Sequence, residues 1–233
     1  VLSGSAKYLF AASGDDDTLN DAFLTQYLGA GGRLMLAEGR TTLDREPLRQ
    51  VLQFYRDGTE RGVIPSTVAT LKNADEVWPI FLSAKAGMAN VSARRYLSER
   101  SVLKNSIFAP IPTRDGSTVS VARAWGFAIV TRQPERRELA ARLIEVLLSA
   151  ENNAAWGKAA NRLPARRSSM LSGAASGSYE QFADKLLKAA QLAPSGSQMT
   201  LVSRVIQSVT QEVLAGKLSP TEAADKAITE LSR

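Results

Sequence analysis

In the first half of the chain, short apolar segments alternate with segments whose apolar residues recur every three or four positions. A short apolar run predicts a buried strand, whereas the longer spacing predicts a helix that buries one stripe. Strands are predicted at 6–12 and 87–92, and helices around 23–28, 48–55 and 77–82. The pattern therefore predicts strands interleaved with helices.

The middle of the chain has a different pattern. Residues 107–112 and 118–131 are apolar and β-branched, and the reverse-turn pair Asp115-Gly116 lies between them. A strand, a turn and a longer strand are expected there. Pro134 is suited to the first turn of a helix, and a stripe at 139–147 predicts that helix.

Only helical periodicity follows, at 179–192, 201–214 and 220–231. Ser219 and Glu222 have the spacing of a capping box, with Pro220 in the first turn. The small residues at 172–178 are typical of a linker or crossover. The order of elements predicts an α/β or α+β protein with a helical C-terminal region.

The amino-acid composition excludes several kinds of catalytic and metal site, but it says less about the fold. The 233 residues include no cysteine and no histidine, which excludes Ser-His-Asp triads, Cys-His pairs and nearly all zinc sites. The net charge of +6 suits nucleic acid or an anionic surface, and equally plain solubility. No apolar run reaches the roughly 18 residues of a membrane-spanning helix.

Five segments are informative in their order along the chain: FLSAKAGMANVS (81–92), FAPIPTRDGS with ARAWGFAIV (108–117 and 122–130), ELAARLIEVLLSAENNAAW (138–156), NRLPARRS (161–168) and VLAGKLSPTEAADKAITEL (213–231). Together they resemble the family 1 extracellular solute-binding proteins, which include maltose- and glycerol-3-phosphate-type binding proteins. The resemblance covers most of the chain, and it begins around the middle of the longer family members.

The resemblance implies an α/β, periplasmic-binding-protein-like type II fold that is incomplete. Residues 1–118 would form the second lobe, and 119–167 would return to the first lobe. Residues 168–233 would be a helical C-terminal segment that packs on the second lobe. The start at Val1 is interpreted as that of a processed or truncated product, with most of the first lobe missing.

The function that the resemblance implies is reversible capture of a sugar or sugar-like solute for an ABC importer. The chain would be its extracellular solute-binding component and deliver the solute to membrane permease subunits. It would act outside the cytoplasm, periplasmic or membrane-anchored, without enzymatic activity, cofactor or metal.

The candidate ligand-binding residues come from four places that match segments lining the family's cleft. They are Asn90, Ser92, Arg94 and Tyr96; Arg123, Ala124 and Trp125; Arg162; and Asp16 and Asp17. Arg94 stands where sugar binders often have tryptophan. Because a guanidinium binds carboxylate or phosphate through two parallel hydrogen bonds, an anionic solute is one alternative.

Each candidate also has a structural interpretation. Trp125 is either a stacking surface or a core or hinge tryptophan, and Arg162 is either a cleft residue or a solvated one. Asp16 and Asp17 also suit the acidic first turn of a helix. Trp78 and Trp156 lie on apolar helical faces, where core packing is expected.

Three other functions remain open. The Arg pairs at 94–95, 136–137 and 166–167 are compatible with a basic nucleic-acid-binding module, although no recognition motif surrounds them. Glu38, Glu60, Asp75 and Glu76 could serve a carboxylate enzyme, although none lies in a recognisable motif. If the first lobe is absent, exposed apolar surface would favour a homodimeric interaction domain.

Overall fold

The computed structural model describes residues 7–12, 20–37, 40–103, 105–171, 177–193 and 197–232. The chain divides into two compact units. Unit 1 comprises Val1–Val91, Pro110–Val121 and Ala193–Arg233, and unit 2 comprises Ser92–Ala109 and Ala122–Leu192. The division differs from the expected domain boundaries, because 92–109 and 168–192 belong to unit 2 together with 122–167.

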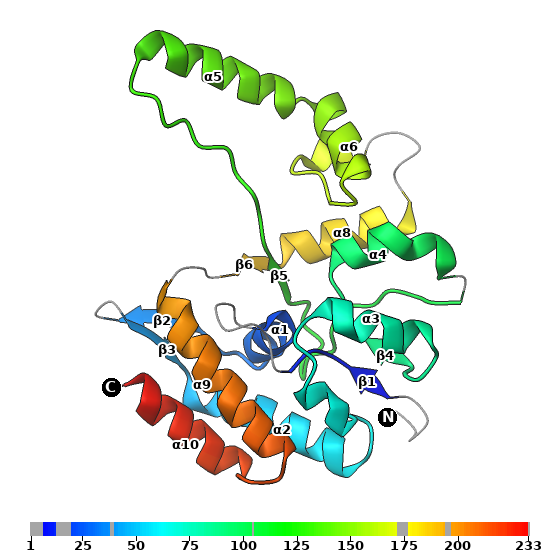
Figure 1. Ribbon diagram of the computed structural model, residues 1–233, viewed down its shortest axis with the longest axis vertical. Coiled ribbons are helices and arrows are strands. Elements are labelled where there is room, and N and C mark those ends of the chain that lie inside the picture. Colours follow the sequence, from blue (N-terminus) through cyan, green and yellow to red (C-terminus); the bar gives the residue numbers. More distant parts are fainter. Residues whose placement is uncertain are drawn as a thin grey trace. The chain divides into compact units, whose positions relative to one another are not determined.

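Unit 1 combines short strands with long helices (Figure 1). Its elements are β1 (Tyr8–Leu9), α1 (Asp21–Gly29), β2 (Leu34–Ala37), β3 (Arg40–Leu43), α2 (Arg45–Glu60), the 3-10 helix η1 (Ser66–Ala69), α3 (Ala74–Leu82), β4 (Met88–Ala89), α9 (Ser197–Leu214) and α10 (Pro220–Leu231). The helices α2, α9 and α10 pack against one another, although α2 is far from the other two in sequence.

The strands form two small sheets in unit 1. The strand β1 pairs with β4 in parallel, with Tyr8 opposite Met88. These two strands lie within the predicted segments 6–12 and 87–92, but each spans two residues only. The antiparallel hairpin of β2 and β3 was not predicted from the sequence.

The core of unit 1 lies between its helices and β1. The predicted stripe of α2 is confirmed, because Leu48, Val51, Leu52 and Tyr55 are all buried. Phe10, which directly follows β1, stacks on Tyr55 with ring centroids 4.8 Å apart. Burial of these large side chains is the main favourable contribution to folding of the unit. Trp78 of α3 is also buried, so its expected core role is confirmed.

Side chains cap the starts of several helices. Asn20 caps α1 by accepting hydrogen bonds from the N–H groups of Ala22 and Phe23. The predicted capping box of α10 is confirmed. Ser219 accepts from the Glu222 N–H, and the Glu222 carboxylate accepts from the Ser219 N–H.

Unit 2 is mainly helical. Its elements are α4 (Ala93–Glu99), the 3-10 helix η2 (Arg100–Val102), α5 (Pro134–Leu147), α6 (Ala150–Ala159), α7 (Arg167–Leu171), α8 (Ser178–Lys188) and β6 (Ala190–Leu192). A further strand, β5 (Ser120–Ala122), lies where the chain passes from unit 1 to unit 2. A small core forms around Met170, Tyr179 and Ala183. None of the described helices has the length and apolar character needed to cross a membrane.

Two expectations for the middle of the chain are wrong. Residues 107–112 form no strand, and only Ser120–Ala122 of 118–131 does. Within the described ranges no other strand pairs with 123–131, and Phe127 and Val130 there are 60% and 90% exposed. Strand propensity alone does not make a strand, because its backbone groups need a neighbour. Trp156 is 55% exposed, so its expected core packing is also wrong.

Candidate functional site

Two of the predicted site residues meet in unit 2. Trp125 lies in the extended segment after β5, and 83% of its surface is exposed. The guanidinium carbon of Arg162 lies 5.9 Å from the centroid of the Trp125 ring. This is the distance of a cation–π contact, which contributes about 0.5–1 kcal/mol at an exposed site. The pair offers an aromatic face and a fixed positive charge side by side.

The loop that carries Arg162 begins at the end of α6. The N–H of Arg162 donates to the carbonyl of Gly157 at 2.8 Å, so the backbone of this residue is held by the helix end. Its side chain is half-buried. Arg162 therefore has a defined position, although it lies in a loop.

A second group of predicted residues lies at the start of α4. Ser92 is the N-cap residue, and its hydroxyl accepts a hydrogen bond from the Arg95 N–H at 3.2 Å. Arg94 is exposed in the first turn. Both side chains lie on one short helix, but the Ser92 hydroxyl is already engaged in capping.

Tyr96 packs into the aromatic core of unit 2. Its ring centroid lies 4.3 Å from that of Tyr179 and 5.9 Å from that of Phe108. Burial raises the pKa of Tyr179 to about 12, which reflects the low polarity of this cluster. Tyr96 thus has a structural role in the fold, and its role in ligand binding stays a prediction.

The remaining predicted residues are dispersed. Asn90 belongs to unit 1, where its side chain hydrogen-bonds the Tyr8 hydroxyl. Burial raises the pKa of Tyr8 to about 12. Arg123 and Ala124 are exposed beside Trp125 in the chain. Asp16 and Asp17 lie outside the described residues.

The structure therefore brings Trp125 and Arg162 together and places Ser92, Arg94 and Tyr96 on one helix and its cap. Among the residues that the structure describes, no hydrogen bond, ion pair or ring contact joins these two groups. Nor do the described residues contain a cluster of three carboxylates that could hold a metal ion.

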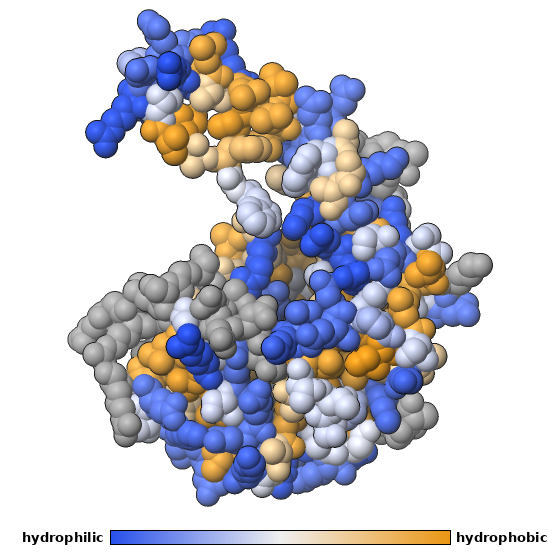
Figure 2. Space-filling model, viewed as in Figure 1, coloured by the Kyte–Doolittle hydropathy of each residue, from blue (hydrophilic) through white to orange (hydrophobic). Residues whose placement is uncertain are grey.

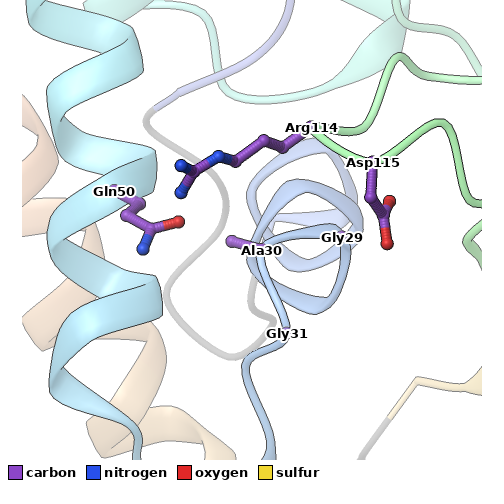
Figure 3. Close-up of a pocket in the computed structure, with 6 residues that line it drawn as sticks. All are labelled: Gly29, Ala30, Gly31, Gln50, Arg114 and Asp115. Atoms are coloured by element: carbon purple, nitrogen blue, oxygen red, sulfur yellow. The ribbon is translucent and has the colours of Figure 1, made fainter.

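Sequence reasoning missed a pocket in unit 1. It has a volume of about 380 Å³ and is lined by Gly29, Ala30, Gly31, Gln50, Arg114 and Asp115. Figure 3 shows the Arg114 side chain reaching toward Gln50 of α2, while Asp115 lies on the other side of the α1 end. The Asp115 carboxylate accepts hydrogen bonds within its own turn, notably from Ser117, and these lower its pKa. The Asp115-Gly116 turn was the only signal in the sequence for this place.

No protein-family model matches the chain, and no curated protein matches it. Solved structures do match. The maltose-bound MalE3 of T. maritima is 18% identical over 97% of this chain and 60% of its own, with a TM-score of 0.72. The cyclic α-maltosyl-1,6-maltose binding protein of Arthrobacter globiformis is 18% identical over 97% of this chain and 58% of its own, with a TM-score of 0.72.

A third match is the ABC transporter solute binding protein of Thermotoga lettingae bound with α-D-tagatose. It is 20% identical over 97% of this chain and 59% of its own, with a TM-score of 0.70. The chain therefore has the fold of periplasmic-binding-protein-like, sugar-binding proteins, as the sequence resemblance implied. It spans about 60% of the length of these structures.

Proposed function

We propose that this chain belongs to the solute-binding component of an ABC importer and captures a sugar or sugar-like molecule reversibly. The observation that carries the proposal is the exposed Trp125 ring with the Arg162 guanidinium against it. The shared fold supports it, since proteins of that fold were solved with maltose and tagatose bound. Binding, with no covalent chemistry, is the proposed activity.

Trp125 and Arg162 have complementary roles in the proposed capture. The indole ring stacks on the apolar face of a sugar ring, and the guanidinium donates hydrogen bonds to hydroxyl oxygens. A carboxylate or phosphate on the sugar would accept two parallel bonds from the same guanidinium. We therefore propose an anionic sugar as the preferred solute. Arg123, which is close to Trp125 in the chain, remains a proposed contributor, as do Asn90, Ser92 and Arg94.

Capture also needs a second wall. Segment 119–167, which contains α5 and α6, is proposed to pack against a further α/β lobe of the kind that completes the solved structures. The exposed apolar side chains of 125–130 and α5 support this, because solvent is an unfavourable environment for them. Solute would favour the closed form of two lobes, and that form would meet the permease outside the cytoplasm.

A thermal-shift screen against neutral sugars, sugar phosphates, uronic acids and polyols tests the proposal. A solute that binds the native state raises the Tm of the protein. Trp125→Ala should weaken binding about tenfold or more, because losing the stacking surface costs about 1.4 kcal/mol or more. Trp156→Ala is the matched control, since Trp156 is also an exposed tryptophan of unit 2.

Three outcomes of the thermal-shift screen would each contradict a different part of the proposal. If both tryptophan variants bind equally well, Trp125 is not a contact. If only neutral sugars bind, the anionic preference is wrong while sugar capture stands. The absence of any shift across the whole panel would contradict the sugar-binding function itself.

A further inference from the structure

The loop that presents Arg162 is fixed to α6 at its beginning. Asn161 adopts a left-handed conformation with φ of 52°, its N–H donates to the Lys158 carbonyl, and the Arg162 N–H donates to the Gly157 carbonyl. These are the paired hydrogen bonds of a Schellman motif at a helix end. The chain direction at Arg162 is therefore set by the end of α6.

The same loop is fixed at its far end by a side chain of α6. Asn153 is 4% exposed, and its carbonyl oxygen accepts a hydrogen bond from the Arg166 N–H at 3.1 Å. Asn153 lies one helical turn before Gly157. Loop 160–166 is thus held at both ends by a single helix.

Gly157 allows the loop to lie directly on that helix. A Cβ atom at this position would lie 3.0 Å from the Arg162 carbonyl oxygen and 3.1 Å from the Pro164 ring. A methyl group at this position would therefore push the loop backbone away from α6 by a few tenths of an ångström. Gly157 is buried, so the contact is also shielded from solvent.

We propose that Asn153 and Gly157 are positioning residues, which hold Arg162 over the Trp125 ring and act on solute binding only through that placement. The inference rests on the proposed function. Its physical basis is preorganisation: a loop that is already ordered loses less conformational freedom when the solute binds. Without these contacts, the guanidinium would sample positions away from the indole.

The test reads the environment of Trp125 with no solute present. The contribution of Trp125 to the fluorescence is the difference between each protein and its Trp125→Phe partner. In Asn153→Ala and Gly157→Ala, this contribution and its quenching by acrylamide should change to those of Arg162→Ala. Asn153→Asp retains the acceptor oxygen and should restore the parental signal. Circular dichroism identifies variants that do not fold. Asn153→Ala and Gly157→Ala alter different contacts of the loop, so each variant tests the proposal separately.

A double variant separates positioning from a general structural effect. In the Arg162→Ala background, Asn153→Ala should leave the Trp125 signal unchanged, because its effect is transmitted by Arg162 alone. Asn152→Ala is the matched control, since the Asn152 side chain of the same helix donates its hydrogen bond to the Val146 carbonyl, outside the loop. The control should keep the parental signal.

Solute affinity provides the second readout. Asn153→Ala and Gly157→Ala should each weaken binding of the best solute in the screen about fivefold, with Asn153→Asp close to the parent. If folded Asn153→Ala and Gly157→Ala keep the parental Trp125 signal, the positioning role is wrong, whatever the solute does. If the signal changes as expected but no sugar binds the parent, positioning stands and the proposed function fails.

Discussion

The hydroxyl group of Tyr27 connects three segments of unit 1. It donates to the Arg33 carbonyl at 2.9 Å and accepts from the Asp44 N–H at 2.6 Å. The side chain is fully buried, and burial raises its pKa to about 12, so the proton that it donates remains bound at neutral pH. One residue of α1 thereby fixes the entrance of the β2–β3 hairpin and the start of α2.

Tyr27→Phe should lower the free energy of unfolding by about 1–3 kcal/mol, because two backbone groups lose their partner. Urea denaturation measures the change. Tyr55→Phe is the control, because the Tyr55 hydroxyl is buried without a hydrogen-bond partner among the described residues. Removing that hydroxyl should be neutral or stabilising. Equal losses in the two variants would contradict this account of Tyr27.

The candidate site was partly predictable at the level of single residues. Trp125 and Arg162 were both selected from segments that resemble a known family, but their contact was not predicted. They are separated in sequence by α5 and α6, and only the folded path of those helices brings them together. Asn153 gave no signal, because an asparagine in a helix is usually solvated and the Arg166 N–H that it binds has no sequence signature.

At the scale of elements, Asp184 connects α7 to α8. Its two carboxylate oxygens accept hydrogen bonds from the Arg167 guanidinium at 2.7 and 3.0 Å, and Lys188 lies 2.9 Å from one of them. The hydrogen bonds from Arg167, and to a smaller extent the one from Lys188, hold the pKa of Asp184 well below its usual range. A depressed pKa in the folded state means that the ionised carboxylate stabilises the fold.

Asp184→Asn should therefore lower the stability of the protein at neutral pH. The folded pKa lies below the unfolded one, so this stabilisation is complete above the unfolded pKa of about 4. This stabilisation is lost progressively as the pH falls from about 4 through the folded pKa. The free energies of unfolding of the parent and of Asp184→Asn should therefore converge as the pH falls through that range. Chemical denaturation at a series of pH values, followed by circular dichroism, measures the difference.

Glu138→Gln is the control for this pH dependence. Glu138 pairs with Arg142 along α5, but both side chains are about two-thirds exposed, so the pair should contribute little. A difference for Asp184→Asn that does not shrink as the pH falls below about 4, or one of equal size for Glu138→Gln, would contradict the assigned role of the Asp184 carboxylate.

The helices were more predictable than the strands, for a physical reason. Helix signals are local, as in the capping box of Ser219 and Glu222, because the hydrogen bonds of a helix join neighbouring residues. Strands need a partner that local sequence does not identify. The hairpin of β2 and β3 was therefore missed, and 123–131 was assigned to a strand that has no described neighbour.

At the scale of the whole molecule, α5 stands out because a helix of 14 residues buries none of its side chains fully. Four of its apolar residues are 42–65% exposed, and we refer to them together as the α5 face: Leu139, Leu143, Val146 and Leu147. Figure 2 shows apolar side chains gathered on this part of unit 2. Their spacing places them on one side of the helix, which is the pattern of a helix that packs on another element.

When no further lobe covers the α5 face, this 233-residue chain should associate with itself through it, because contact removes apolar side chains from water. Leu139→Gln together with Leu143→Gln should shift the chain toward monomer in sedimentation velocity across a concentration series. The free energy of unfolding should change little, since both side chains are already exposed.

Leu201→Gln, at a leucine of α9 that is 53% exposed, is the control and should sediment as the parent does. A monomeric parent, or an equal shift toward monomer in the double variant and in Leu201→Gln, would show that the α5 face does not drive association. A shift in the double variant alone would identify the α5 face as the surface that a covering lobe must bury.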